Sequence, residues 1–137
     1  MRTLSVTLCL LCVLVASNLS AQAKSVSGKS ETCRQAVGKT QKDLDNALAF
    51  CKSSVPKDLA VQGVIAMESL LWIKVNRALA DALRADRLTT EQVVKQWINQ
   101  WKTLSGSKSV TVYVEWQDVE IAKGETTIFS GDKVTIK

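Results

Sequence analysis

Residues 88–117, LTTEQVVKQWINQWKTLSGSKSVTVYVEWQ, contain a change of hydrophobic period that decides the fold. Up to Leu104 the apolar residues recur at helical spacing, and Thr89 with Gln92 matches a capping box, so a helix is predicted here. After the Ser105–Ser107 turn, valines alternate with polar residues, which predicts a strand. One stretch therefore joins a helical part to a sheet.

The predicted strand has one apolar face and one wet face. Its valines point one way with Trp116, while Thr111, Tyr113 and Glu115 point the other way. Tyr113 is therefore our candidate for a contact with a partner, flanked by Thr111 and Glu115. The alternative is an ordinary cross-strand packing residue.

Two glycines downstream, Gly124 and Gly131, predict turns between short strands. We expect three or four antiparallel strands in a β-meander over residues 108–137. A small sheet must bury its apolar face, and the helices are the obvious cover.

Two further helices are predicted before residue 88. The first begins after Thr40, a plausible N-cap with Asp43 three residues later. The second, from Asp58 to Asp86, carries an apolar stripe with further apolar residues opposite, which predicts a central helix. Glu68 falls within that stripe, where a carboxylate is costly unless paired. It is a candidate site residue, with a structural ion pair as the alternative.

Cys33 and Cys51 are predicted to form a disulfide. They are the two cysteines that remain once the predicted N-terminal export signal, residues 1–23, is removed, and an even number of cysteines in an exported chain favours pairing. One unbroken helix between them would rise about 27 Å, whereas disulfide Cα atoms lie roughly 4.4 to 6.8 Å apart. Gly38 offers the break that lets the chain before it fold back. A bond between two chains of a dimer is the alternative, although a monomer is favoured.

The N-terminus has the pattern of an export signal. Residues 1–23 place Arg2 before an apolar run and end in Ala21-Gln22-Ala23, a small-x-small cleavage site. We expect an exported protein, in a bacterial periplasm or outside the cell, with no membrane anchor in the mature chain. Residues 24–30 are polar and predict a flexible leader.

These patterns predict an α+β fold. About three helices pack on a small antiparallel β-sheet formed by the C-terminal third, and one disulfide staples the domain. The single domain covers residues 31–137, with residues 31–104 helical.

Several chemistries are disfavoured by composition. The chain contains no histidine, so Ser-His-Asp or Cys-His catalysis is excluded, as are histidine-containing zinc sites. It also contains no glycine-rich phosphate loop and no EF-hand spacing. We expect no cofactor, no metal and no enzymatic activity. Carboxylate chemistry involving Glu68 is the remaining catalytic alternative.

The charge balance points away from nucleic acid. Removal of the export signal takes away Arg2, so the basic residues fall from 18 to 17 against 13 acidic residues, a net charge of +4. The lysines are scattered along the sequence and form no basic cluster.

Three tryptophans, Trp97, Trp101 and Trp116, are expected in the core, with an apolar or carbohydrate-binding surface as the alternative.

Two segments resemble known families. Residues 118–137, DVEIAKGETTIFSGDKVTIK, resemble one hairpin of the lipopolysaccharide-transport β-jellyroll family. In that family the hairpin sequence motif is repeated along the chain, whereas it occurs once in this sequence. The layout from AFCKSS through GVIAMESLL to LTTEQVVKQWI is similar to small helical immunity proteins of the type VI secretion system. Their second cysteine pair is missing in this chain, and no functional residue is carried over.

The predicted function is that of a small exported binding protein without catalytic activity. An inhibitor, immunity-type or adaptor module for another protein fits the disulfide and the exposed Tyr113 face best. The alternative is a carrier of an apolar ligand or lipid in the cell envelope, which requires an apolar pocket of several hundred Å³.

Overall fold

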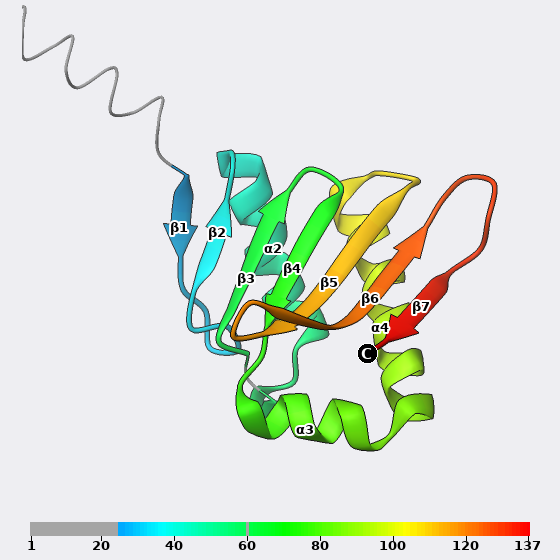
Figure 1. Ribbon diagram of the computed structural model, residues 1–137. Coiled ribbons are helices and arrows are strands. Elements are labelled where there is room, and N and C mark those ends of the chain that lie inside the picture. The colour runs from blue at the N-terminus through cyan, green and yellow to red at the C-terminus, as the bar shows by residue number, and fades with distance from the viewer. Residues whose placement is uncertain (1–24, 60) are drawn as a thin grey trace, which may run out of the picture.

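The computed structural model describes residues 25–59 and 61–137, so the expected signal peptide, residues 1–23, lies outside the described residues (Figure 1). The described chain forms seven strands, three α-helices and one 3₁₀ helix. In chain order these elements are β1 (Val26–Gly28), β2 (Ala36–Gly38), α2 (Gln41–Ser54), η1 (Lys57–Leu59), β3 (Gly63–Met67), β4 (Leu70–Lys74), α3 (Arg77–Ala85), α4 (Arg87–Ser105), β5 (Val110–Trp116), β6 (Val119–Thr126) and β7 (Lys133–Ile136).

All seven strands form one mixed sheet in the order β1 to β7. Neighbours are antiparallel except β2–β3 and β4–β5, which are parallel. Each parallel pair requires a crossover, which α2 supplies in the first case and α3 with α4 in the second. Figure 1 shows α2 and α4 on the same side of the sheet, with α3 across its lower end.

The α+β class is confirmed, but the sheet is not confined to the C-terminal third. Strands β5, β6 and β7 come from that third and are antiparallel to one another, as predicted. The other four strands come from residues 26–74, part of which we had expected to be helical. Residues 26–28, expected in a flexible leader, form the edge strand β1.

The predicted helix from Asp58 to Asp86 is wrong. Its first part forms η1, β3 and β4, and its end forms α3, capped by Asn76. In β3 and β4 both faces carry apolar side chains, so helical and strand periods fit the same residues. The apolar residues that looked like the second side of a helix therefore lie on the second face of a sheet.

The two other predicted helices are present. Thr40 caps α2 through a capping box with Asp43, as expected. Helix α4 begins at Arg87, and its N-cap is Asp86 in place of Thr89. The Asp86 carboxylate accepts hydrogen bonds from the backbone N–H and the hydroxyl of Thr89, at 3.1 and 2.7 Å. Thr89 was predicted because Thr89 and Gln92 match the capping-box pattern, whereas the actual cap, Asp86, lies before the first apolar residue of the helix.

The core lies between α2, α4 and one face of the sheet. Phe50 of α2 packs edge to face against Trp97 and Trp101 of α4, with ring centroids 6.3 and 6.2 Å apart. The indole N–H of Trp97 donates to the Ser54 carbonyl, and that of Trp101 donates to the Ser69 carbonyl. Trp97 and Trp101 are thus core residues, as we expected, and Trp116 is partly buried against the same core.

The disulfide joins Cys33 to Cys51 within one chain, with Cα atoms 5.8 Å apart, and both residues are buried. It ties the segment before β2 to the end of α2. Gly38 lies at the turn into that helix, where a Cβ atom would stand 2.2 Å from the backbone nitrogen of Leu44. The fold-back therefore depends on glycine through close approach of backbone to backbone.

Candidate functional site

One face of the sheet is left without a helix. The register aligns one residue from each of five strands on this face: Val37, Ile65, Trp72, Tyr113 and Lys123, from β2 to β6. Their side chains point away from the core-facing residues of the same strands. All five are partly or fully exposed. We call this the open-face row.

The aromatic pair at the centre of the row is closely packed. The rings of Trp72 and Tyr113 are stacked, with centroids 5.3 Å apart and planes 12° apart. The Lys123 Nζ atom lies 5.7 Å from the Tyr113 ring centroid, in cation–π range. Because Trp72 is on β4 and Lys123 on β6, they contact Tyr113 from opposite sides. Tyr113 therefore offers its ring edge and hydroxyl, but no free ring face, to a ligand.

A second row on the same face shows how polarity changes across the sheet. The register aligns Met67, Leu70, Thr111 and Glu125 from β3 to β6. Carbon-rich side chains lie on β3 and β4, whereas a hydroxyl and a carboxylate lie on β5 and β6. The open face thus has an apolar half that borders a polar half.

A charged cluster lies at the end of this face. The Lys74 ammonium forms ion pairs with Glu115 and, at 3.1 Å, with Asp118. Partial burial lowers the pKa of Lys74, but hydrogen bonds to Glu115 and Asp118 and the charges of both carboxylates outweigh burial, so the pKa is raised above 10.5. The lysine is fixed as a cation between two acids.

The β5–β6 turn brings Asp118 over the face. Gln117 and Asp118 form this turn with φ angles of 50° and 63°, and the β5–β6 register shifts between Val114 and Glu115. Such irregularities increase the local twist and bend a strand pair. In Figure 1 the turn reaches in front of β3 and β4 at the lower end of the sheet.

A hollow of about 400 Å³ lies beside this turn on the open face. Val37 and Ile65 of the open-face row line it together with Lys74, and Gln35, Gln117 and Asp118 complete its polar side. A protruding side chain of a partner could enter here, with an apolar floor and charged groups at one wall.

The structure places three of the four sequence-predicted site residues on one face of β5 and the fourth in another segment. Thr111, Tyr113 and Glu115 share the open face of β5, as predicted. Glu68 was expected within a buried helical stripe, and this is wrong: it lies exposed in the β3–β4 turn with a φ of 54°. Trp72 was missed as a site residue because its segment was assigned to a helix.

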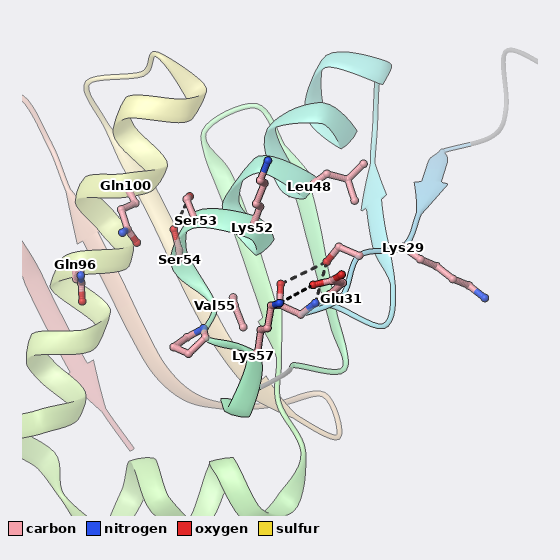
Figure 2. A pocket seen from close by; sticks show the side chains of 13 residues that line it. Lys29, Glu31, Leu48, Lys52, Ser53, Ser54, Val55, Lys57, Gln96 and Gln100 are labelled. Atoms are coloured by element: carbon pink, nitrogen blue, oxygen red, sulfur yellow. Dashed lines mark hydrogen bonds and ion pairs between the residues drawn. The ribbon is translucent and has the colours of Figure 1, made fainter.

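A wider hollow of about 890 Å³ lies near the disulfide, between the β1–β2 connection, the end of α2 and α4. Three lysines line it: Lys29, Lys52 and Lys57. Figure 2 shows Lys29 directed away from the other two, while Lys57 pairs with Glu31 at 3.2 Å. Both partners of that ion pair are about four-fifths exposed. The three ammonium groups do not converge, so this hollow is a weaker candidate than the open face.

A smaller apolar cavity of about 260 Å³ lies between η1, α3 and α4. Its lining includes Val55, Pro56, Leu79, Leu83, Val93 and Trp97. The volume is below the roughly 300 to 1,000 Å³ of most small-molecule sites.

Comparison of the chain with protein-family models, with curated proteins and with solved structures finds no match. Within residues 25–59 and 61–137, no cluster of three or more acidic or cysteine side chains is placed to hold a metal ion. In the same part of the chain, no helix is long and apolar enough to cross a membrane. A function is therefore proposed from the open face itself.

Proposed function

We propose that the protein is a small exported binding module without catalytic activity that docks another protein on the open face of its sheet. The open-face row carries this proposal. It places a tryptophan and a tyrosine beside aliphatic side chains at the centre of a surface, with charged groups at the margin. Protein interfaces have this composition, with Trp and Tyr dominating the binding energy and charges at the rim.

The packing of the aromatic pair favours a protein over a sugar as the ligand. Sugar rings stack on free aromatic faces, whereas the faces of Tyr113 are covered by Trp72 and Lys123. The exposed edges, the Tyr113 hydroxyl and the hollow beside Ile65 suit the irregular surface of a folded partner.

The setting is that of an exported inhibitor, immunity-type or adaptor module, with a bacterial periplasm favoured over the extracellular space. The N-terminal sequence pattern supports export. The Cys33–Cys51 disulfide is compatible with an oxidising compartment.

Site-specific photocrosslinking tests the docking face. A photoreactive residue at Thr111 should crosslink to a protein in the host's own envelope extract, whereas one at Asn99 on the exposed side of α4 should not. With the captured partner purified, Ile65→Arg should weaken binding by about thirtyfold, because the new charge faces the apolar half of the interface. Asn99→Arg is the matched control. Equal crosslinking at both positions, or equal affinity of both arginine variants, would reject the open face.

A carrier of an apolar ligand or lipid is the second candidate, favoured by the apolar cavity between η1, α3 and α4. Native mass spectrometry of protein isolated from its host would then show a small-molecule adduct. The adduct should disappear in Leu83→Trp, which fills the cavity.

A further inference from the structure

The loop between β6 and β7 exposes two large apolar side chains next to each other. Phe129 is 98% exposed and Ile128 is 68% exposed. The other large apolar residues that are exposed in the described chain occur singly. Apolar surface presented at the tip of a hairpin loop costs free energy in water and marks a contact with an apolar medium.

The backbone of this tip is ordered by its own hydrogen bonds. The Thr127 N–H donates to the Ser130 carbonyl at 3.3 Å, and the Ser130 N–H donates to the Thr127 hydroxyl oxygen at 3.0 Å. The two hydroxyl groups are themselves 2.7 Å apart. These bonds pair polar groups of Thr127 and Ser130 within the loop, which lowers the cost of moving the tip into a medium without water, where unpaired N–H and C=O groups are costly.

Lysines gather at the same end of the sheet. The register places the β2–α2 connection, the β3–β4 turn, the α4–β5 loop and the β6–β7 loop at one end, which is uppermost in Figure 1. Three acidic side chains are accessible at this end: the exposed Glu68 and the partly exposed Asp132 and Glu125, of which Glu125 is opposite Lys133 in the register. Four lysines are exposed there: Lys39, Lys42, Lys108 and Lys133.

We propose that this end of the molecule docks on an anionic lipid bilayer, with Ile128 and Phe129 inserted at the boundary between headgroups and acyl chains. Five strand spacings of about 4.8 Å separate Lys39, directly after β2, from Lys133 of β7 by roughly 24 Å. A continuous anionic surface can contact all of these lysines simultaneously. A protein pocket that holds the two apolar side chains would contact only the charges beside the tip. Inserted apolar area and lysines near the surface strengthen peripheral binding together. This inference does not depend on a protein partner for the open face.

Vesicle sedimentation tests the proposal with the secreted, oxidised protein, whose N-terminal residue is first determined by mass spectrometry. The protein should sediment with vesicles of equal parts phosphatidylglycerol and phosphatidylcholine, and less with phosphatidylcholine alone. Phe129→Ser should weaken partitioning by about tenfold or more. Leu88→Ser is the control, because Leu88 is 76% exposed at the other end of the sheet. Lys108→Gln should weaken binding by about fivefold, and Lys52→Gln at the far end of α2 should not.

Insertion is read directly from Phe129→Trp, whose fluorescence should shift to the blue on these vesicles while that of Leu88→Trp does not. Unchanged folding of both variants is checked by circular dichroism. Failure of the unmodified protein to sediment, or equal sedimentation of Phe129→Ser and Leu88→Ser, overturns the proposal. Oligomers in analytical ultracentrifugation that disappear in Phe129→Ser, without vesicle binding, would also overturn it and assign the tip to a second copy of the chain.

Discussion

The Oδ1 atom of Asp43 accepts a hydrogen bond from the backbone N–H of Glu68 at 3.1 Å. Its Oδ2 atom accepts a second bond from the Thr40 N–H at 3.3 Å, within the capping box of α2. Asp43 is only 5% exposed. A single buried carboxylate thus satisfies donors on two segments, and it ties the start of α2 to the turn between β3 and β4.

Replacement of Asp43 by alanine should lower the free energy of unfolding by about 1 to 3 kcal/mol, because it removes the N3 half of the capping box and leaves two N–H donors without an acceptor. Asp43→Asn should cost less, since an amide oxygen can still accept one bond. Urea unfolding followed by circular dichroism measures both. The control is Asp45→Ala on the exposed side of the same helix, expected within about 0.5 kcal/mol. Equal losses for both alanine variants would contradict a bridging role for Asp43.

Local sequence patterns predicted the elements with a single apolar period. Helix α4 and strand β5 each have one apolar face, and the capping box at Thr40 marks the start of α2 in the sequence. Strands β3 and β4 were missed because they are apolar on both faces, which removes the alternation that marks a half-buried strand. Their pairing with β2 and β5 is parallel and non-local, so no hairpin turn in the sequence indicates it.

The residues of the candidate site were likewise predictable where the strand has one apolar face and were missed elsewhere. Thr111, Tyr113 and Glu115 could be placed on one face because β5 alternates cleanly. Trp72 and Lys123 could not, because their contacts with Tyr113 depend on the register of three strands. Glu68 was misplaced together with its helix. Its left-handed backbone conformation in a two-residue turn carries none of the usual Gly, Asn or Asp signals.

Removal of the disulfide should lower stability without changing the oligomeric state. The double variant Cys33→Ala/Cys51→Ala should lose roughly 3 kcal/mol, as the chain-entropy model gives for a loop of this length, here with a sequence separation of 18. Urea unfolding measures the loss, and native mass spectrometry should show a monomer for both proteins. A covalent dimer of the unmodified protein would contradict the bond within one chain.

The Lys74 cluster should make stability sensitive to alkaline pH. The pKa of Lys74 is raised in the folded state above its ordinary value of 10.5, so the folded protein binds this proton more tightly than the unfolded chain does. The ion pairs therefore stabilise the fold at neutral pH, where Lys74 is protonated, and the contribution is lost as pH rises through the folded pKa of Lys74. Since the side chain is about one-quarter exposed, we expect a contribution of up to about 1 kcal/mol.

The measurement compares the unfolding free energy of the unmodified protein with that of Lys74→Gln from neutral to alkaline pH. The difference between the two should shrink above pH 10.5, where other groups titrate equally in both proteins. Lys95→Gln removes a more exposed ion pair with Glu91 and should change stability by less than about 0.5 kcal/mol at neutral pH. A difference for Lys74→Gln that stays constant with pH would contradict the raised pKa.

Gly124 permits the close approach of α4 to β6. We had expected this glycine in a turn, but it lies within β6, and a Cβ atom there would stand 2.6 Å from Ile98 Cδ1 and 2.6 Å from Val94 Cγ1. Gly124→Ala should therefore lower the free energy of unfolding by roughly 1 to 3 kcal/mol through overpacking. Gly131→Ala is the matched control, since nothing lies within 4 Å of a Cβ atom there and the change should be within about 0.5 kcal/mol.

A second substitution in α4 distinguishes overpacking from a general loss of strand stability. Val94→Ala alone creates a cavity, but combined with Gly124→Ala it removes one of the two carbons, Val94 Cγ1, that the new methyl group would meet at 2.6 Å. The double variant should thus be more stable than the sum of the two single losses by about 1 kcal/mol, a coupling expected of residues in contact. Additive losses would mean that α4 shifts away from β6 without a cost in stability. The role of Gly124 would then lie within strand β6 and not in its contact with α4.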